Sequence, residues 1–144
     1  MPDANTHIEG AHVVDLAHDR DAITALIEQI LGVAEQNGVG GSAAFAIRLA
    51  IEEAITNAFE HGHKGLSDDL TIRVEHRIEP GVFEFAVEDQ GPGFQPSALP
   101  DPTLLGNLSK PSGRGVMLMK AYMSEVSFNA QGNRVKMRYI APSA

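Results

Sequence analysis

The sequence predicts an α+β fold with helices on one face of a mainly antiparallel sheet. Apolar residues recur at helical spacing in the first part of the chain, and from about residue 70 they alternate with polar residues as in strands. Turn sequences rich in glycine and proline separate neighbouring alternating runs, which favours hairpins. The chain has 144 residues, the usual size of one domain, and we expect residues 1–144 to form a single domain.

The first expected elements are a strand and a helix. Residues 12–16 alternate weakly and predict the strand. Apolar residues then follow helical spacing from Ile23 to Ala34. Either Asp19 or Asp21 can cap this helix, because a carboxylate accepts hydrogen bonds from the free N–H groups of a first turn.

A second helix is expected after a glycine break. The chain after the first helix is broken by three glycines, Gly38, Gly40 and Gly41. Ser42 can then cap a second helix, which ends near Gly62. Its apolar side chains recur at helical spacing: Phe45, Leu49, Ala50, Ala54 and Ile55.

Two hairpins are predicted in the second half of the chain. The first alternates over residues 70–78 and 83–87, around a Pro-Gly turn. The second alternates over residues 126–128 and 135–139, around a Gly-Asn turn. Antiparallel pairing across these turns provides most of the sheet.

A long loop and a short helix separate the two hairpins. Residues 94–112 show little periodicity, and residues 92–111 hold five of the eight prolines. A loop of this length inside a compact domain is usually a functional lid or a disordered segment. Residues 116–122 then have the spacing of a short helix.

Composition excludes several classes of function. The chain has no cysteine, which rules out a disulfide scaffold, a thiolate zinc site and a cysteine nucleophile. No apolar run reaches the roughly 20 residues of a membrane span, and residues 1–10 lack the features of a signal peptide. The net charge of −8 opposes non-specific binding to nucleic acid. We therefore expect a cytoplasmic protein that binds neither nucleic acid nor membranes.

The charge is also unevenly placed. Residues 1–109 carry 5 basic and 18 acidic side chains, a net −13, whereas residues 110–144 carry 6 basic and 1 acidic, a net +5. An anion site is therefore expected near the basic tail.

Glu53 and Asn57 are the first candidate site residues. They are four apart and lie on the same side of the second helix, with His61 one turn further. An asparagine amide oxygen is a hard neutral ligand suited to Mg²⁺, and a carboxylate one turn away can act as a general base. Spacing alone favours the alternative, a solvated polar face with an Arg48–Glu52 ion pair.

A second candidate follows the strand at residues 83–87. An ionised Asp89 only accepts hydrogen bonds, so it suits an exocyclic amine such as that of adenine. Gly91 and Gly93 allow the backbone to approach a flat ligand closely. The alternative is a plain Asp-Gly turn that ends the strand.

A third candidate is the sequence Ser112-Gly113-Arg114-Gly115 before the short helix. Glycines there expose N–H groups at a helix N-terminus, where the helix dipole favours phosphate. The sequence lacks the third glycine of the dinucleotide fingerprint and the Lys-Ser/Thr of a Walker loop. Taken alone, it suits a flexible junction between loop and helix.

The pair His61 and His63 gives a weaker signal. No helical His-Glu-x-x-His pattern is present, so a zinc site is poorly supported. We interpret these histidines as residues at a helix C-terminus, where histidine favours the helix dipole.

Taken in chain order, the three candidates resemble the GHKL ATPase superfamily, which includes DNA gyrase and histidine kinases. The resemblance runs from about Arg48 to Tyr122. Within the superfamily, residues 53–62 resemble the N-box, and residues 113–119 the second glycine box, of the small bacterial anti-sigma factor serine/threonine kinases. The resemblance implies a two-layer α/β sandwich of the Bergerat type.

The same resemblance implies a site for ATP and Mg²⁺. Asn57 would bind the metal and Asp89 the adenine. Glu53 would be the base that accepts the proton of a serine hydroxyl on a partner protein. The glycines that shape the pocket would be Gly91, Gly93, Gly113 and Gly115.

The implied function is a regulatory protein serine/threonine kinase that binds a sigma factor and phosphorylates an antagonist protein, and a homodimer is plausible. Kinases of this group often carry a basic residue just before the second glycine box, where Pro111 and Ser112 stand here. Lys110 and Arg114 are then the candidate contacts to the γ-phosphate. The alternative is an ATP-dependent protein-binding switch without phosphotransfer.

Overall fold

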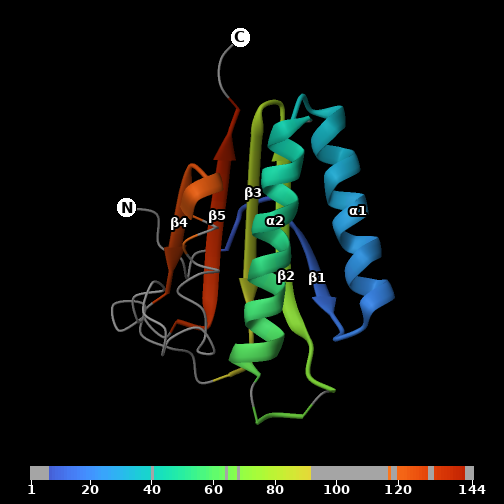
Figure 1. Cartoon of the computed structure of the whole chain (residues 1–144), viewed down its shortest axis with the longest axis vertical. Coiled ribbons are helices and arrows are strands. Elements are labelled where there is room, and N and C mark those ends of the chain that lie inside the picture. The colour runs from blue at the N-terminus through green and yellow to red at the C-terminus, as the bar shows by residue number, and fades with distance from the viewer. Residues whose placement is uncertain are drawn as a thin grey trace.

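In the described part of the chain, a five-stranded antiparallel sheet forms one layer, and the helices α1 (Arg20–Gln36) and α2 (Ser42–Thr56) pack on it as a second layer (Figure 1). The computed structural model describes residues 7–39, 41–63, 65–67, 69–91, 117, 120–129 and 132–141. The elements in chain order are β1 His12–Leu16, α1 Arg20–Gln36, α2 Ser42–Thr56, the π-helical turn η1 Asn57–Gly62, β2 Ile72–Glu79, β3 Val82–Glu88, β4 Glu125–Phe128 and β5 Arg134–Ile140.

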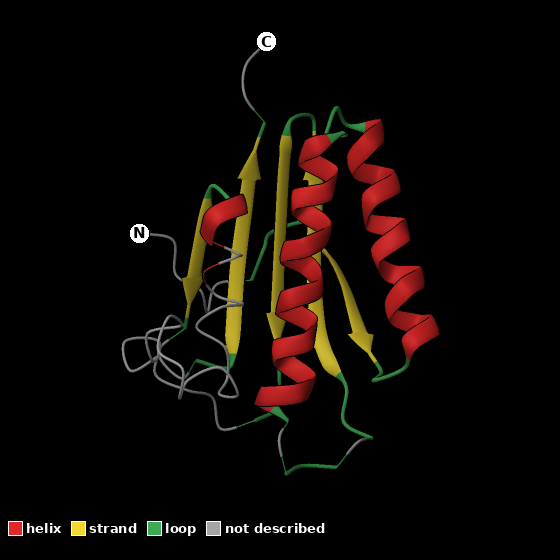
Figure 2. Cartoon of the chain, in the orientation of Figure 1, coloured by secondary structure: helices red, strands yellow, loops and turns green. Residues whose placement is uncertain are grey.

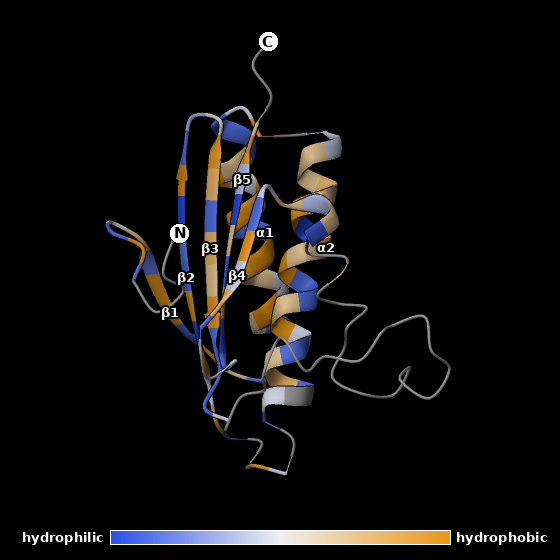
Figure 3. Ribbon diagram, turned by 90° about the vertical axis from the view of Figure 1, so that its left-hand side faces the viewer, coloured by the Kyte–Doolittle hydropathy of each residue, from blue (hydrophilic) through white to orange (hydrophobic). Residues whose placement is uncertain are grey.

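The sheet has the strand order β1-β2-β3-β5-β4, with every neighbouring pair antiparallel. Figure 2 shows both helices crossing the same face of the sheet, and Figure 3 shows the two layers from the side. The predicted fold class and both predicted hairpins are confirmed.

The core lies between the helices and the sheet. Alternation along β2 and β3 sends Val74, Phe83 and Phe85 to the helical side, where each is fully buried. They meet α1 and α2 through Ile30 and Ile51, which are equally buried. Burial of a large apolar side chain contributes roughly 1.5–3 kcal/mol relative to its exposure.

The first helix begins as predicted. Asp19 is its N-cap, and its carboxylate accepts a hydrogen bond from the N–H of Ala22 at 2.9 Å. The predicted cap of the second helix is wrong. Ser42 is already the first helical residue, and the N-cap is Gly41, which makes no side-chain hydrogen bond. Gly41 has a φ of +63°, a backbone conformation that favours glycine.

The second helix changes geometry before it ends. It is α-helical to Thr56 and then π-helical from Asn57 to Gly62, so the predicted end at Gly62 holds but the uniform α-helix does not. The N–H of His63 donates to the carbonyl of Ala58 at 3.0 Å, five residues back, which continues the wider turn. Such π-turns are frequent at functional sites.

The sheet face opposite the helices carries a buried ion pair. Glu75 on β2 and Arg134 on β5 have side chains only 1% exposed, and the guanidinium of Arg134 donates to the Glu75 carboxylate. The N–H of Ile8 also donates to Glu75, at 3.2 Å, so the N-terminal segment covers part of this face. Among the described residues, no helix is both long and apolar enough to cross a bilayer.

Candidate functional site

The ends of two elements meet at one end of the molecule. The π-turn that follows α2 and the C-terminal end of β3 lie together there (Figure 1). A Cβ on Gly62 would clash with the carboxylate of Asp89, and a Cβ on Gly91 would clash with the carbonyl oxygen of Gly62. Only glycine allows this approach, so the helix end and the strand end touch through backbone.

The Gly91→Ala variant tests this contact. We expect it to lower the free energy of unfolding by about 1–3 kcal/mol, because the added methyl group forces the two backbones apart. Denaturant unfolding measures the change. Gly32→Ala is the matched control, since nothing lies within 4 Å of a Cβ there, and alanine in mid-helix should stabilise by about 0.5–1 kcal/mol. Equal stability of the Gly91→Ala variant and the wild type would contradict the packing described.

Asp89 is half-buried at this junction. Its carboxylate accepts a hydrogen bond from the N–H of Gly91 at 2.8 Å. Burial, with a smaller contribution from the neighbouring Glu88, raises the pKa of Asp89 from 3.8 to about 6. The carboxylate is therefore largely ionised at pH 7, at a cost in desolvation, and can accept a further hydrogen bond.

The turn between β4 and β5 supports Asp89 from the other side. The N–H of Asp89 donates to the carbonyl of Asn133 at 2.9 Å. The side-chain oxygen of Asn129 accepts from the N–H groups of Asn133 and Arg134, at 3.0 and 3.2 Å. Sequence reasoning missed Asn129 as a supporting residue, because the contact depends on pairing across the sheet.

His63 directly follows the helix C-terminus, where the sequence interpretation placed it, but it plays a different part there. Its side chain is buried, and its Nε2 accepts a hydrogen bond from the N–H of Gln90 at 2.9 Å. Burial, aided by the nearby His18, lowers the pKa of His63. The ring is therefore neutral at pH 7, and the expected interaction of a charged histidine with the helix dipole is wrong for this residue.

Glu53 and Asn57 lie one turn apart where α2 becomes the π-turn. Both are half-buried, and the N–H of Asn57 bonds to the carbonyl of Glu53. The predicted row does not continue to His61 at α-helical spacing, because the backbone beyond Asn57 is π-helical. The alternative ion pair is also present: Arg48 donates to Glu52 at 3.5 Å and to Glu28 of α1.

Several predicted site residues fall outside the part of the chain that the structure describes. These are Gly93, Lys110, Gly113, Arg114 and Gly115. Their predicted roles stay predictions, as does the loop over residues 94–112.

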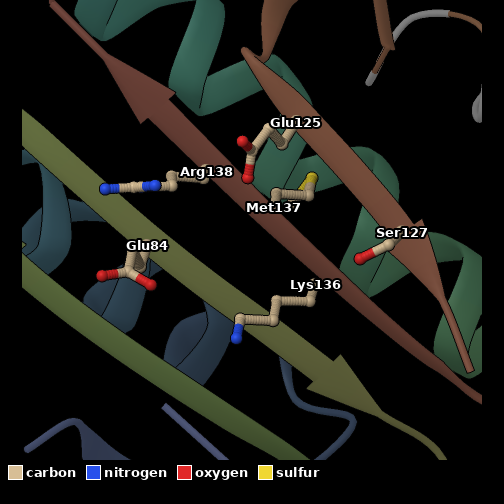
Figure 4. A pocket seen from close by; sticks show the side chains of 6 residues that line it. All are labelled: Glu84, Glu125, Ser127, Lys136, Met137 and Arg138. Atoms are coloured by element: carbon tan, nitrogen blue, oxygen red, sulfur yellow. The ribbon is translucent and has the colours of Figure 1, made fainter. Parts of the chain in front are cut away.

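Much of the basic tail lies away from this site. Lys136 and Arg138 of β5 project from the open sheet face, beside Glu84 of β3 and Glu125 of β4 (Figure 4). Glu84 pairs with Arg138 across the strands, and Arg138 pairs with Glu125, so opposite charges alternate over this face. Arg134 is paired to Glu75, so two of the six basic residues of the tail, Arg134 and Arg138, lie opposite acidic residues of the sheet.

Comparison with known proteins agrees with the predicted family and fold. Residues 16–139 match the family described as histidine kinase-like ATPase domain. The chain is 34% identical over 83 residues to the anti-sigma F factor of Halalkalibacterium halodurans, covering 56% of each chain. It is 38% identical over 63 residues to the serine-protein kinase RsbW of Listeria monocytogenes, covering 44% of this chain and 40% of the relative. The matched stretches thus span about half the length of these relatives.

A solved structure supports the fold. The RsbU and RsbW domains of Rv1364c from Mycobacterium tuberculosis superpose with a TM-score of 0.58 at 19% identity, covering 91% of this chain and 31% of that one. The family match extends beyond the predicted motifs to both hairpins and to the whole of α1, and it begins at Leu16, the last residue of β1. The chain belongs to the histidine kinase-like ATPase domain family.

Proposed function

We propose that this protein binds ATP with Mg²⁺, transfers the γ-phosphoryl group to a serine or threonine of an antagonist protein, and binds a sigma factor. The observation that carries the proposal is the close approach of the Gly62 backbone to the Asp89 carboxylate and to Gly91. This contact brings two of the three ordered motifs together, next to a carboxylate that accepts hydrogen bonds. Relatives named anti-sigma F factor and serine-protein kinase support the same assignment.

The donor set fits the proposed ligands. Asp89 offers an ionised oxygen to the exocyclic amine of adenine, and Gly91 keeps the adjoining backbone free of side chain. The amide oxygen of Asn57 is a ligand type that Mg²⁺ accepts, and the bound ion would neutralise phosphate charge. Lys110 or Arg114 would contact the γ-phosphate, and the remaining glycines, Gly93, Gly113 and Gly115, would complete the pocket.

Glu53 is the proposed base. Its carboxylate takes the proton of the acceptor hydroxyl while the hydroxyl oxygen bonds to the γ-phosphorus. The bond from that phosphorus to the bridging oxygen breaks, and ADP leaves with the bonding electrons. Glu53 suits this role better than Glu52, because Glu52 is engaged by Arg48.

The Glu53→Gln variant tests the transfer step. We expect it to bind ATP as the wild type does and to lower phosphotransfer by about 10²–10⁴-fold, the usual contribution of a positioned base. Calorimetric titration measures ATP binding. Transfer is measured as label from γ-labelled ATP on serine or threonine of a dephosphorylated extract of the source cell.

The neighbouring Glu52→Gln variant is the matched control and should retain transfer. Full transfer by Glu53→Gln would reject the base assignment. A wild type that binds ATP but labels no protein would reject the kinase in favour of the second candidate, an ATP-dependent protein-binding switch. That candidate is favoured by Pro111 and Ser112, which replace the basic residue typical of the kinase group. Homodimerisation is a further proposal, and sedimentation tests it.

A further inference from the structure

His63 lies between the π-turn that follows α2 and the C-terminal end of β3. It belongs to neither of the predicted motifs that meet there. It follows the π-turn directly, and its side chain is only 7% exposed. The edge of its ring packs against Phe59, with centroids 5.8 Å apart and planes at 79°. Phe59 in turn stacks on His18 at 4.4 Å. The orientation of the His63 ring is thus restrained by Phe59, which in turn stacks on the segment before α1.

That orientation gives the ring one defined hydrogen bond. Nε2 of His63 lies 2.9 Å from the backbone nitrogen of Gln90. A backbone N–H only donates, so Nε2 is the acceptor and the ring proton is on Nδ1. His63 therefore fixes the peptide between Asp89 and Gln90 through a side chain that comes from the helix layer.

Other bonds hold the same peptide segment from the sheet side. The side chain of Gln90 donates to the carbonyl of Thr71 at 2.8 Å, and the N–H of Asp89 donates to Asn133. On the side that faces the helices, the same segment is contacted by His63 through its hydrogen bond and by the backbone of Gly62. The position of the Asp89 carboxylate relative to the helix end depends on both.

We propose that His63 is a positioning residue for base recognition, which acts through the N–H of Gln90 to hold the Asp89 carboxylate where it accepts the exocyclic amine of a purine. The inference rests on the proposed function, in which Asp89 contacts adenine. His63 itself touches no ligand. Its contribution is to purine discrimination, because a displaced carboxylate loses the distance and angle that a hydrogen bond requires.

The experiment compares ATP with inosine triphosphate, whose base carries a carbonyl oxygen in place of the amine. Dissociation constants are measured by calorimetry for the wild type, His63→Leu and His63→Gln. We expect the wild type to prefer ATP and His63→Leu to reduce that preference by roughly tenfold, since it lacks the acceptor. His63→Gln should keep most of the preference, because its amide oxygen reaches about as far as Nε2.

The matched control is His76→Leu. His76 is also a buried histidine with a pKa lowered by burial, but it lies within β2, stacked on His12. Loss of a buried imidazole there should leave the ratio of the two affinities unchanged. A general loss of stability would weaken both nucleotides equally, so the ratio separates positioning from folding.

The outcomes distinguish the inference from the function on which it rests. A wild type that binds ATP and inosine triphosphate equally rejects the role of Asp89 and with it the inference. A wild type that prefers ATP, with an unchanged preference in His63→Leu, rejects the inference alone. Nitrogen NMR of the wild-type histidines gives a second test that needs no variant: a proton on Nε2 of His63 at neutral pH would overturn the proposal.

Discussion

Arg134→Met is expected to lower the free energy of unfolding by about 3–5 kcal/mol, the usual cost of removing one partner of a buried ion pair. Both side chains of the Glu75–Arg134 pair are 1% exposed, so the variant leaves a carboxylate without its charge partner away from water. Burial opposes the ionisation of Glu75, but the hydrogen bond and charge of Arg134, with bonds from His7 and Ile8, hold its pKa below the ordinary value.

The pH dependence of the Arg134→Met variant has a definite sign. A lowered folded-state pKa stabilises the wild type above the ordinary pKa of 4.5, and this stabilisation is lost as the pH falls through the folded-state value. The difference between the variant and the wild type should therefore be largest at pH 7 and should shrink in acid. Urea unfolding of both proteins at pH 7 and at acid pH measures this difference in the free energy of unfolding.

Two further variants make the Arg134 result specific. Lys136→Met changes a half-buried residue on the same strand and face and should alter stability by no more than about 0.5 kcal/mol. The double variant Glu75→Leu/Arg134→Met should recover most of the loss, because it leaves no unpaired buried charge. Glu88, whose carboxylate lies 3.6 Å from Arg134, is 37% exposed and can be solvated. A loss of less than 1 kcal/mol in Arg134→Met would show that the pair is not buried in solution.

Asp89→Asn is expected to weaken ATP binding by about 10- to 100-fold and, at the same time, to raise the midpoint of thermal unfolding. The loss in affinity is that of a hydrogen bond to a charged group. The gain in stability follows from the raised pKa. At pH 7 the wild-type carboxylate is ionised although its burial disfavours the charge, which costs stability. The amide of Asp89→Asn carries no charge and can still accept the hydrogen bond from the N–H of Gly91.

The sign of the Asp89 effect also follows from linkage. The folded-state pKa of about 6 lies above the ordinary 3.8, so the folded state binds more protons between these values. Wild-type stability from this group falls as the pH rises through that window, and the advantage of Asp89→Asn should disappear below pH 4. Calorimetry measures the expected loss of ATP affinity, and thermal unfolding at two pH values measures the expected gain in stability. Glu84→Gln, on the same strand but on the open face, should leave ATP affinity unchanged. Unaltered ATP affinity in Asp89→Asn would remove Asp89 from the site.

The parts of the fold that the sequence predicts correctly depend on interactions between residues close together in the chain. The cap at Asp19, the helix after it and both hairpins depend on residues close together in the chain, where periodicity and turn chemistry act. The cap at Ser42 was wrong because a glycine with positive φ can start a helix without a side-chain bond. The π-turn at Asn57 was missed because no residue pattern marks the fifth-residue hydrogen bond.

The sequence predicts the residues of the candidate site but not the contacts that hold the described ones in place. The approach of Gly62 to Gly91, the bond from Gln90 to His63 and the Asn129 turn all join residues distant in the chain. The predicted anion site near the basic tail stays a prediction, because Lys110 and Arg114 lie outside the described residues. Three basic residues of the tail alternate along β5 with the strand period of two, which places them on one face of the sheet: Arg134, Lys136 and Arg138.

The π-turn separates two requirements that a plain α-helix would tie together. In α2 the phase of the helix is set by the core, where Ile47, Ile51 and Ile55 must face the sheet. A π-turn is an α-helical turn with one residue added, so the residues after Asn57 take a new phase without disturbing those before it. The orientation of Gly62 and His63 toward β3 can therefore change by insertion or loss of one residue while the core keeps its register.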